Sequence, residues 1–161
     1  MPRFELTGPA THEGCRKPVR DAVLLIQSHL ADPRAVEDLD LALTEACTNV
    51  VRHAYPGDAP GRLRIRVDID PGREVVVEVT DWGVGLPPGV EPGALPGPEA
   101  QSGRGFYLMA RLCDEMTIRC DRDGTVVRLR KCVPGPGWNP DTVSPSGPDS
   151  GPEPFPEKDP A

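Results

Sequence analysis

The sequence predicts a single domain of the α+β class, a two-layer sandwich with helices on one face of a mostly antiparallel, mixed sheet. Three observations lead to this prediction. The chain of 161 residues has room for one hydrophobic core of ordinary domain size. Two segments in its first third repeat apolar residues at helical spacing. Two later pairs of segments alternate apolar and polar residues on either side of a turn sequence, as antiparallel hairpins do.

The first third of the chain is expected to form a short edge strand over residues 2–7 and two helices. The first helix is predicted over 16–30, where one side carries Val19, Val23, Ile26 and Leu30. The second starts with Asp32, a capping side chain, followed by Pro33 at the first helical position. Its apolar side continues to about Ala54, where the sequence Tyr-Pro-Gly-Asp ends it.

Two hairpins account for the predicted sheet. The first joins strands over 63–69 and 75–79 through an Asp-Pro-Gly turn, and the second joins 116–120 and 125–132 through Asp-Arg-Asp-Gly. A short helix is predicted between them, over 104–112. Helices and hairpins in this order favour a helical layer on one face of the sheet.

The composition changes at Pro134, after which Pro, Gly, Ser and acidic residues predominate. Such a segment buries too little apolar surface to offset its ordering entropy. The sequence therefore predicts one folded domain over 1–133 and a disordered, acidic, Pro/Gly-rich tail over 134–161. An alternative remains open for Trp138, which could dock onto a partner or back onto the domain.

Charge and composition exclude some functions. The formal net charge of −7 argues against direct contact with nucleic acid, because a phosphate-binding protein needs a basic face. No segment has the length and apolarity of a membrane span or a leader sequence, so a cytoplasmic location is expected. The five cysteines are odd in number and form no Cys-x-x-Cys pair, which predicts reduced thiols.

Three motifs in order predict a nucleotide site. Glu45 and Asn49 are four residues apart and so lie side by side on the second helix. The sequence Asp81-x-Gly83-x-Gly85 follows the first hairpin, and Gly103-Arg104-Gly105 opens the short helix. The glycines would permit the close backbone approach that a nucleotide needs.

These motifs, followed by Gly-Thr-x-Val at 124–127, resemble the ATP-binding (Bergerat) fold shared by gyrase, Hsp90, histidine kinases and MutL. Within that superfamily, the sequences Glu-Ala-Cys-Thr-Asn at 45–49, His-Ala-Tyr-Pro at 53–56 and Arg-Gly-Phe-Tyr-Leu-Met at 104–109 are most similar to anti-sigma factor serine kinases of bacterial sporulation and stress response. The resemblance covers about residues 5–132. One such motif arises easily by chance, whereas four in the right order are specific.

The resemblance implies a role for each residue on the second helix. Asn49 matches the amide that coordinates Mg²⁺, and its oxygen is a hard ligand suited to that cation. Glu45 matches the general base that accepts the proton of an attacking hydroxyl. For His53, one turn further on, two interpretations stay open: contact with the phosphates, or capping of the helix end.

The resemblance places adenine at the strand-end motif. Asp81 matches the carboxylate that accepts a hydrogen bond from the adenine amino group, and guanine would present a repelling carbonyl there. Gly83 and Gly85 would let the chain bend over the base, and Thr125 matches a threonine at the adenine edge. A plain turn after a strand and an ordinary β-branched strand residue are the alternative interpretations of Asp81 and Thr125.

The third motif is expected to bind the phosphates. Gly103, Arg104 and Gly105 would present backbone N–H groups at a helix start, and Arg104 would add a charge-assisted hydrogen bond. A glycine that only precedes a helix is the simpler alternative for Gly103. The Pro- and Gly-rich segment 86–101 takes the place of the ATP lid, although a plain connector would have the same composition.

The resemblance as a whole implies an anti-sigma factor with protein serine/threonine kinase activity. Such a protein binds a sigma factor of RNA polymerase and uses ATP and Mg²⁺ to phosphorylate a serine of an anti-anti-sigma antagonist of the STAS-domain type. A homodimer is also implied, and helix 16–30 is a candidate interface, unless it only covers the sheet. The alternatives are a nucleotide-dependent binding module without kinase activity, or with a partner other than a sigma factor, and a protein that acts chiefly through its acidic tail.

Overall fold

The structure is a computed structural model of the whole chain, and residues 1–86 and 104–142 are described here. Three α-helices, five strands and two short irregular helices make up these residues. In chain order they are β1 (Arg3–Pro9), α1 (Arg16–His29), α2 (Pro33–Asn49), η1 (Val50–Ala54), β2 (Arg62–Asp70), β3 (Glu74–Asp81), α3 (Arg104–Leu112), β4 (Glu115–Asp121), β5 (Gly124–Cys132) and η2 (Gly135–Gly137). Every predicted helix and strand is present.

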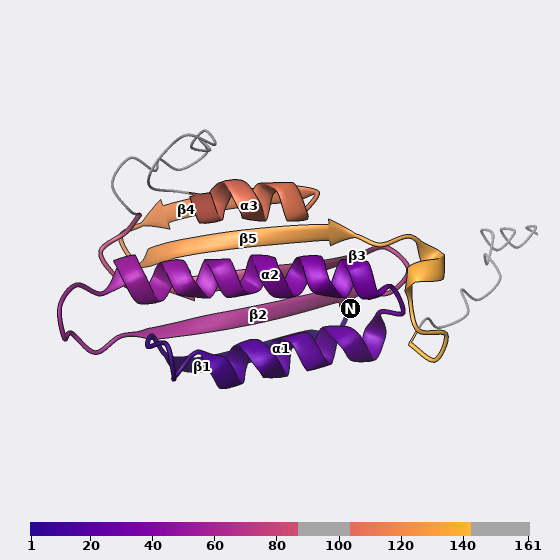
Figure 1. Cartoon of the computed structure of the whole chain (residues 1–161), viewed down its shortest axis with the longest axis horizontal. Coiled ribbons are helices and arrows are strands. Elements are labelled where there is room, and N and C mark those ends of the chain that lie inside the picture. Colours follow the sequence, from indigo (N-terminus) through magenta and orange to yellow (C-terminus); the bar gives the residue numbers. More distant parts are fainter. Residues whose placement is uncertain (87–103, 143–161) are drawn as a thin grey trace, which may run out of the picture.

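The five strands form one sheet in the order β1-β2-β3-β5-β4. Each strand pairing within the described residues is antiparallel. The sequence predicted a mostly antiparallel sheet that is mixed, but these residues contain no parallel pairing. The three α-helices lie side by side over one face of this sheet, with α2 between α1 and α3 (Figure 1). The predicted α+β class and two-layer arrangement are confirmed.

The core lies between the two layers. Alternate residues of β2, β3 and β5 face the helices and are buried, because strand side chains point to opposite faces in turn. The helices contribute their apolar sides to the same cluster, which includes Ile26, Leu39, Leu43, Phe106 and Met109. Polar and charged residues occupy most alternate positions on the other face of the sheet, which no helix of the described chain covers.

Capping explains where α2 begins. The Asp32 side chain accepts hydrogen bonds from the backbone N–H groups of Arg34 and Ala35, at 2.9 and 3.3 Å, and Pro33 occupies the first helical position. The end of the helix differs from the prediction. The α-helix stops at Asn49 and continues as a π-helical turn, η1, to Ala54. Turns of this wider type are frequent at functional sites.

The segment that follows β5 packs against the domain. Residues 134–142 belong to the predicted tail and are among the residues that the structure describes. Trp138 is only 3% exposed, and its indole N–H donates to the carbonyl oxygen of Val133 at 2.7 Å. Trp138 also forms an isolated antiparallel bridge with Leu30, at the end of α1. One large aromatic side chain thus buries enough area to hold a proline-rich segment against the domain.

Candidate functional site

The phosphate side of the candidate site forms where α3 begins against α2. Gly105 lies so close to α2 that a Cβ atom there would be 2.8 Å from Oε2 of Glu45 and 3.4 Å from Nδ2 of Asn49. The structure therefore brings these three predicted residues together. Only glycine fits the second position of α3 without displacing the Glu45 carboxylate.

Asn49 carries an unsatisfied polar group at this contact. Its Nδ2 is buried and has no hydrogen-bond partner within the described residues. A buried amide without a partner costs about 1–3 kcal/mol, and native proteins rarely keep one without a reason. The side chain is thus ready to pair with a ligand group, as the nucleotide hypothesis requires. In residues 1–86 and 104–142 no three His, Cys, Asp or Glu side chains cluster as metal ligands, so a cation here would rely on Asn49 and on phosphate oxygens.

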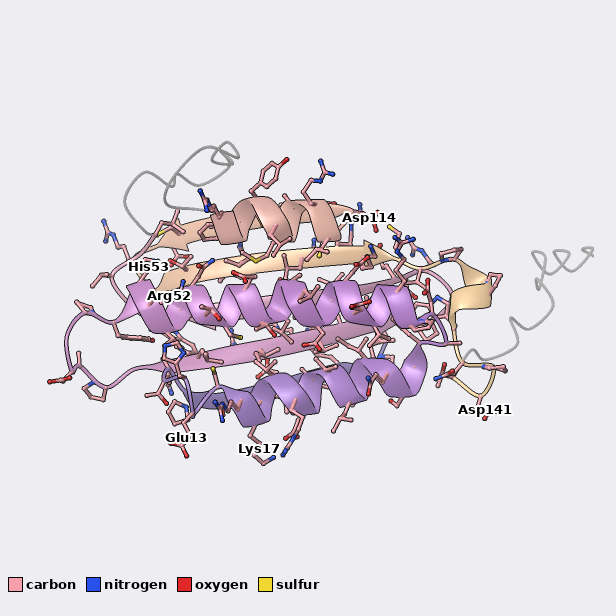
Figure 2. The ribbon with its side chains drawn as sticks, viewed as in Figure 1. Glu13, Lys17, Arg52, His53, Asp114 and Asp141 are labelled. Atoms are coloured by element: carbon pink, nitrogen blue, oxygen red, sulfur yellow. The ribbon has the colours of Figure 1, made fainter. Side chains whose placement is uncertain are left out.

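His53 lies on the π-helical turn that follows Asn49. Its side chain is exposed and also lines the small pocket that Asn49 lines. Figure 2 shows His53 and Arg52 at the end of α2 that is nearest the start of α3. His53 therefore lies on the side of the cavity where the resemblance places the phosphates, and both of its interpretations stay predictions.

Asp81 is the last residue of β3, a central strand of the sheet, and it is only 5% exposed. Burial raises the pKa of its carboxyl above the ordinary range, while a hydrogen bond from the backbone N–H of Gly83 to Oδ1, at 2.9 Å, acts in the opposite direction. One carboxylate oxygen therefore has a backbone partner. The other has no protein partner within the described chain and remains available to a ligand.

The two glycines after Asp81 serve different purposes. A side chain at Gly83 would overlap the carbonyl oxygen of Ala54, which also accepts a hydrogen bond from Val84 N–H at 2.8 Å. Gly83 thus lets the turn after β3 press against the end of η1. Gly85 has φ +105°, a conformation that side-chain-bearing residues rarely adopt.

Thr125 lies directly opposite Asp81 across the β3–β5 pairing and is 3% exposed. Its hydroxyl donates to Sγ of Cys120 at 3.6 Å, so one neighbour on β4 orients it. The preceding residue, Gly124, has φ +133°, and a side chain there would overlap the Asp81 carbonyl oxygen. Asp81 and Thr125 therefore form one wall of a shared site, at the end of two paired strands.

A family model described as the histidine kinase-like ATPase domain matches residues 9–131 of the chain. The chain belongs to this family. The matched residues contain every candidate site residue, from Glu45 on α2 to Thr125 on β5. The resemblance inferred from the motifs is thereby confirmed.

Relatives of this ATPase domain are named as a protein kinase and as an anti-sigma factor. Serine-protein kinase RsbW of Bacillus licheniformis is 35% identical over 99 residues, which are 56% of this chain and 61% of that protein. Anti-sigma F factor of Clostridium botulinum (strain Eklund 17B / Type B) is 35% identical over 101 residues, which are 60% of this chain and 70% of that protein. The chain thus spans about three fifths of the length of the first relative.

A solved structure shows the same fold. The RsbU and RsbW domains of a Mycobacterium tuberculosis protein superpose with a TM-score of 0.55 at 21% identity. The match covers 81% of this chain and 32% of that one.

The pocket of the ATPase domain is nearly closed in this structure. It is lined by residues from α2, η1, the β3 end, α3 and β5, among them Asn49, Asp81, Gly85, Phe106 and Thr125, and its volume is about 20 Å³. Ligand pockets usually measure about 300–1,000 Å³, so a nucleotide would have to displace some of this lining. A larger hollow of about 520 Å³ lies between α1 and α2 and contains none of the predicted site residues.

Gly103 and Arg104 are the two predicted residues of the ATPase domain that precede and begin α3. Gly103 lies outside the described residues, as does most of the expected lid over 86–101. Arg104 is the first residue of α3, and it is exposed. It makes no ion pair with another described residue, so its guanidinium is available to a phosphate.

Sequence reasoning assigned no role to two residues that shape the ATPase site. Tyr55 follows η1, and its hydroxyl donates to the Arg62 carbonyl oxygen at 2.7 Å and accepts from Trp82 N–H at 2.9 Å. It thereby holds the segment after Asp81 in place. Cys120 orients Thr125. Tyr55 belongs to the quoted His-Ala-Tyr-Pro sequence, which was a usable signal, whereas an isolated cysteine on a strand gives none.

Within residues 1–86 and 104–142 no helix combines the length and the apolarity needed to cross a lipid bilayer.

Proposed function

We propose that the chain is an ATP-dependent protein serine/threonine kinase that acts as an anti-sigma factor. It would bind a sigma factor and phosphorylate a serine of an anti-anti-sigma antagonist of the STAS-domain type, and so regulate transcription in the cytoplasm. Two kinds of support converge on this function. The chain belongs to an ATPase-domain family, and relatives are named serine-protein kinase and anti-sigma factor.

The contact between Gly105 and the pair Glu45 and Asn49 carries the proposal. A positively polarised helix N-terminus faces a carboxylate and a buried, unpaired amide there. That set suits a phosphate group and its counter-ion. Magnesium, when bound, would neutralise charge on the phosphate oxygens.

The chain's own residues have separate tasks in the transfer. Asp81 and Thr125 fix the base at one end of the pocket, and Arg104 with the first N–H groups of α3 holds the phosphates at the other. Glu45 accepts the proton of the substrate serine hydroxyl as its oxygen forms a bond to the γ-phosphorus. The bond from that phosphorus to the β–γ bridging oxygen breaks, and ADP leaves.

Opening of the pocket is part of this proposal. Leu86 and Phe106 line the small cavity together with Asp81 and Asn49. The Leu86 end and the start of α3 flank the residues 87–103, which correspond to the expected lid. Nucleotide binding would therefore have to displace part of this cavity lining.

A comparison of transfer and binding tests the function. We expect Glu45→Gln to bind Mg-ATP nearly as tightly as the wild type and to lose phosphate transfer to the antagonist by at least about a hundredfold, because the base is gone and the shape is kept. Asn49→Ala should lose Mg²⁺-dependent ATP binding as well as transfer. Glu37→Gln, an exposed change on the same helix, is the matched control. Calorimetry and transfer from radiolabelled ATP measure the two quantities.

The alternative, a nucleotide-dependent binding module, predicts a different pattern. Wild-type protein would then bind Mg-ATP and hold its partner without label appearing on any serine. A failure to bind ATP at all would exclude both functions. We also propose that the protein forms a homodimer, and sedimentation of the wild type measures its molar mass.

A further inference from the structure

The face of the sheet without helices carries rows of charged side chains that pair across the strands. In one row Arg66 lies between Glu5 and Glu78 and makes ion pairs to both, at 3.4 and 3.2 Å. Glu78 also forms an ion pair with Arg128, in which Nε of Arg128 lies 3.5 Å from Oε1 of Glu78. In the next row Arg130 pairs with Glu74 and Glu115. Each arginine in these rows therefore has an acidic partner within the sheet.

The row nearest the candidate site lacks such partners. Arg64 lies between Thr7 and Thr80, and within the described residues neither Arg64 nor Arg62 makes an ion pair. Both guanidinium groups instead approach the ring of Trp82, with Cζ at 4.4 Å from the ring centroid for Arg62 and 5.6 Å for Arg64. Nε of Arg64 is buried without a hydrogen-bond partner. Two uncompensated cations therefore share one aromatic ring in a protein whose net charge is −7.

A surface hollow lies beside Trp82 and Arg62. Tyr55, Pro60, Gly61, Arg62 and Trp82 line an open hollow of about 440 Å³, and Trp82 is 36% exposed although it is large and apolar. We call these residues, together with Arg64, the Trp82 patch. A shallow site lined by aromatic rings and proline suits a proline-rich segment, whose extended conformation is largely formed before it binds. The arginines add a preference for acidic residues beside the prolines.

We propose that residues 143–161 of the same chain bind to the Trp82 patch. This segment contains the sequence Gly-Pro-Glu-Pro-Phe-Pro-Glu-Lys-Asp-Pro, in which Phe155 stands between two prolines and two glutamates. Its acidic residues are Asp149, Glu153, Glu157 and Asp159, and its basic residue is Lys158, so its side chains carry a net charge of −3. Phe155 against Trp82, with the flanking glutamates on Arg62 and Arg64, matches both the apolar and the charged parts of the patch.

The reach of the segment is sufficient. Thr142 is the last described residue, and its side chain donates to the carbonyl oxygen of His29 at 3.3 Å, at the end of α1. Trp82 lies at the opposite end of the sheet, beyond the last residue of β3. A nine-residue strand such as β2 spans about 30 Å, whereas the 13 residues from Thr142 to Phe155 reach about 40 Å as a polyproline helix.

Docking on the Trp82 patch would couple the segment to the ATP site. Trp82 directly follows Asp81, and Tyr55 links both the Trp82 backbone and Arg62 to the end of η1. A ligand on the patch would therefore restrain the backbone that carries the adenine-binding carboxylate. The docking itself requires no nucleotide, and it stands whether or not the chain is a kinase.

Nuclear magnetic resonance of the full chain without nucleotide tests the docking directly. The two tryptophans give two indole N–H signals, and Trp138→Phe identifies the signal of Trp82. A variant with Asp149→Asn, Glu153→Gln, Glu157→Gln and Asp159→Asn should shift the Trp82 signal and leave the Trp138 signal in place. About 1 M salt, where the Debye length is about 3 Å, should move the wild-type signal in the same direction.

A reciprocal experiment and two controls decide between occupants. Arg62→Gln with Arg64→Gln should shift the backbone signals of residues 149–159, whereas Arg111→Gln, an exposed change on α3, should not.

An unchanged Trp82 signal in the tail variant would overturn the proposal. A shift caused instead by Glu91→Gln with Glu99→Gln would overturn it in favour of the segment 87–103. Shifts that disappear on tenfold dilution would assign the site to the segment of a second copy.

Discussion

At the scale of single residues, Asp81 combines a functional requirement with a cost to stability. Burial raises the pKa of this carboxyl, which means that the folded protein holds the proton more tightly than the unfolded chain does. A raised carboxyl pKa lowers stability as pH increases from the unfolded value through the folded value. At neutral pH the charged Asp81 therefore destabilises the fold, and the N–H of Gly83 offsets this in part.

The substitution Asp81→Asn separates these two effects. Its Oδ1 can still accept from Gly83 N–H, and the buried charge is removed, so the free energy of unfolding should rise at pH 7. The gain should vanish below about pH 3.8, where the carboxyl is protonated in both states. ATP affinity should fall by about 5- to 150-fold, equivalent to about 1–3 kcal/mol for a lost buried hydrogen bond, and discrimination against GTP should weaken.

Urea unfolding at the two pH values and calorimetry with ATP and GTP measure these effects. Asp58→Asn, an exposed change in the loop before β2, is the control and should alter neither quantity. A variant that is less stable than the wild type at pH 7 would contradict the assigned cause of the pKa shift.

At the scale of elements, the α2–α3 contact determines whether the site exists. The amphipathic pattern predicted α2, and the short helix predicted over 104–112 is present as α3. The π-helical turn η1 was not predicted, although Ala46, Val50 and Ala54 are all buried at a spacing of four residues. Such a spacing is compatible with an α-helix as well, so local sequence could not distinguish the two.

The motifs predicted which residues belong to the site but not how they meet. The four-residue spacing of Glu45 and Asn49 places both on one side of α2, which follows from helix geometry alone. That Gly105 approaches this side within van der Waals distance depends on how α3 packs, which is a tertiary property. The same is true of Cys120, which reaches Thr125 only because β4 and β5 pair in their observed register.

The substitution Gly105→Ala tests the close contact between the two helices. In most helices this change is stabilising by up to about 1 kcal/mol. Here the new methyl group would lie 2.8 Å from Oε2 of Glu45, so we expect the carboxylate to be displaced and phosphate transfer to fall by about a hundredfold. Gly135→Ala is the matched control, because no heavy atom lies within 4 Å of the added group. Equal transfer rates for both variants would show that Glu45 does not act from this position.

At the scale of the whole molecule, the segment after β5 closes the domain at the end opposite the ATP site. Trp138 packs into the core cluster, and Asn139 donates side-chain hydrogen bonds to the carbonyl oxygens of Gln27 and Ser28, at 3.2 and 2.9 Å. Composition predicted disorder from Pro134 because an average over the segment hides single large aromatic residues such as Trp138.

The substitution Trp138→Ala measures how much the packing of this segment stabilises the domain. We expect the free energy of unfolding to fall by about 3–5 kcal/mol, as for other buried aromatic side chains that are truncated. Trp82→Ala should cost much less, because that ring is partly exposed and its cation–π contacts contribute about 0.5–1 kcal/mol each. Urea denaturation of both variants gives the comparison, and similar losses would mean that Trp138 is not part of the core.

The strand order has a consequence for the time at which the protein becomes competent during synthesis. β3 acquires its second neighbour, β5, only after the chain has reached Cys132, because β5 follows β4 in sequence and lies between β3 and β4 in the sheet. Until then Asp81 stands on an open sheet edge without Thr125 opposite it. Pairings between such distant segments form late in folding. A nascent chain on the ribosome therefore displays the complete Glu45 helix before Thr125 can complete the proposed adenine site, and the proposed response to ATP would begin only after β5 has been synthesised.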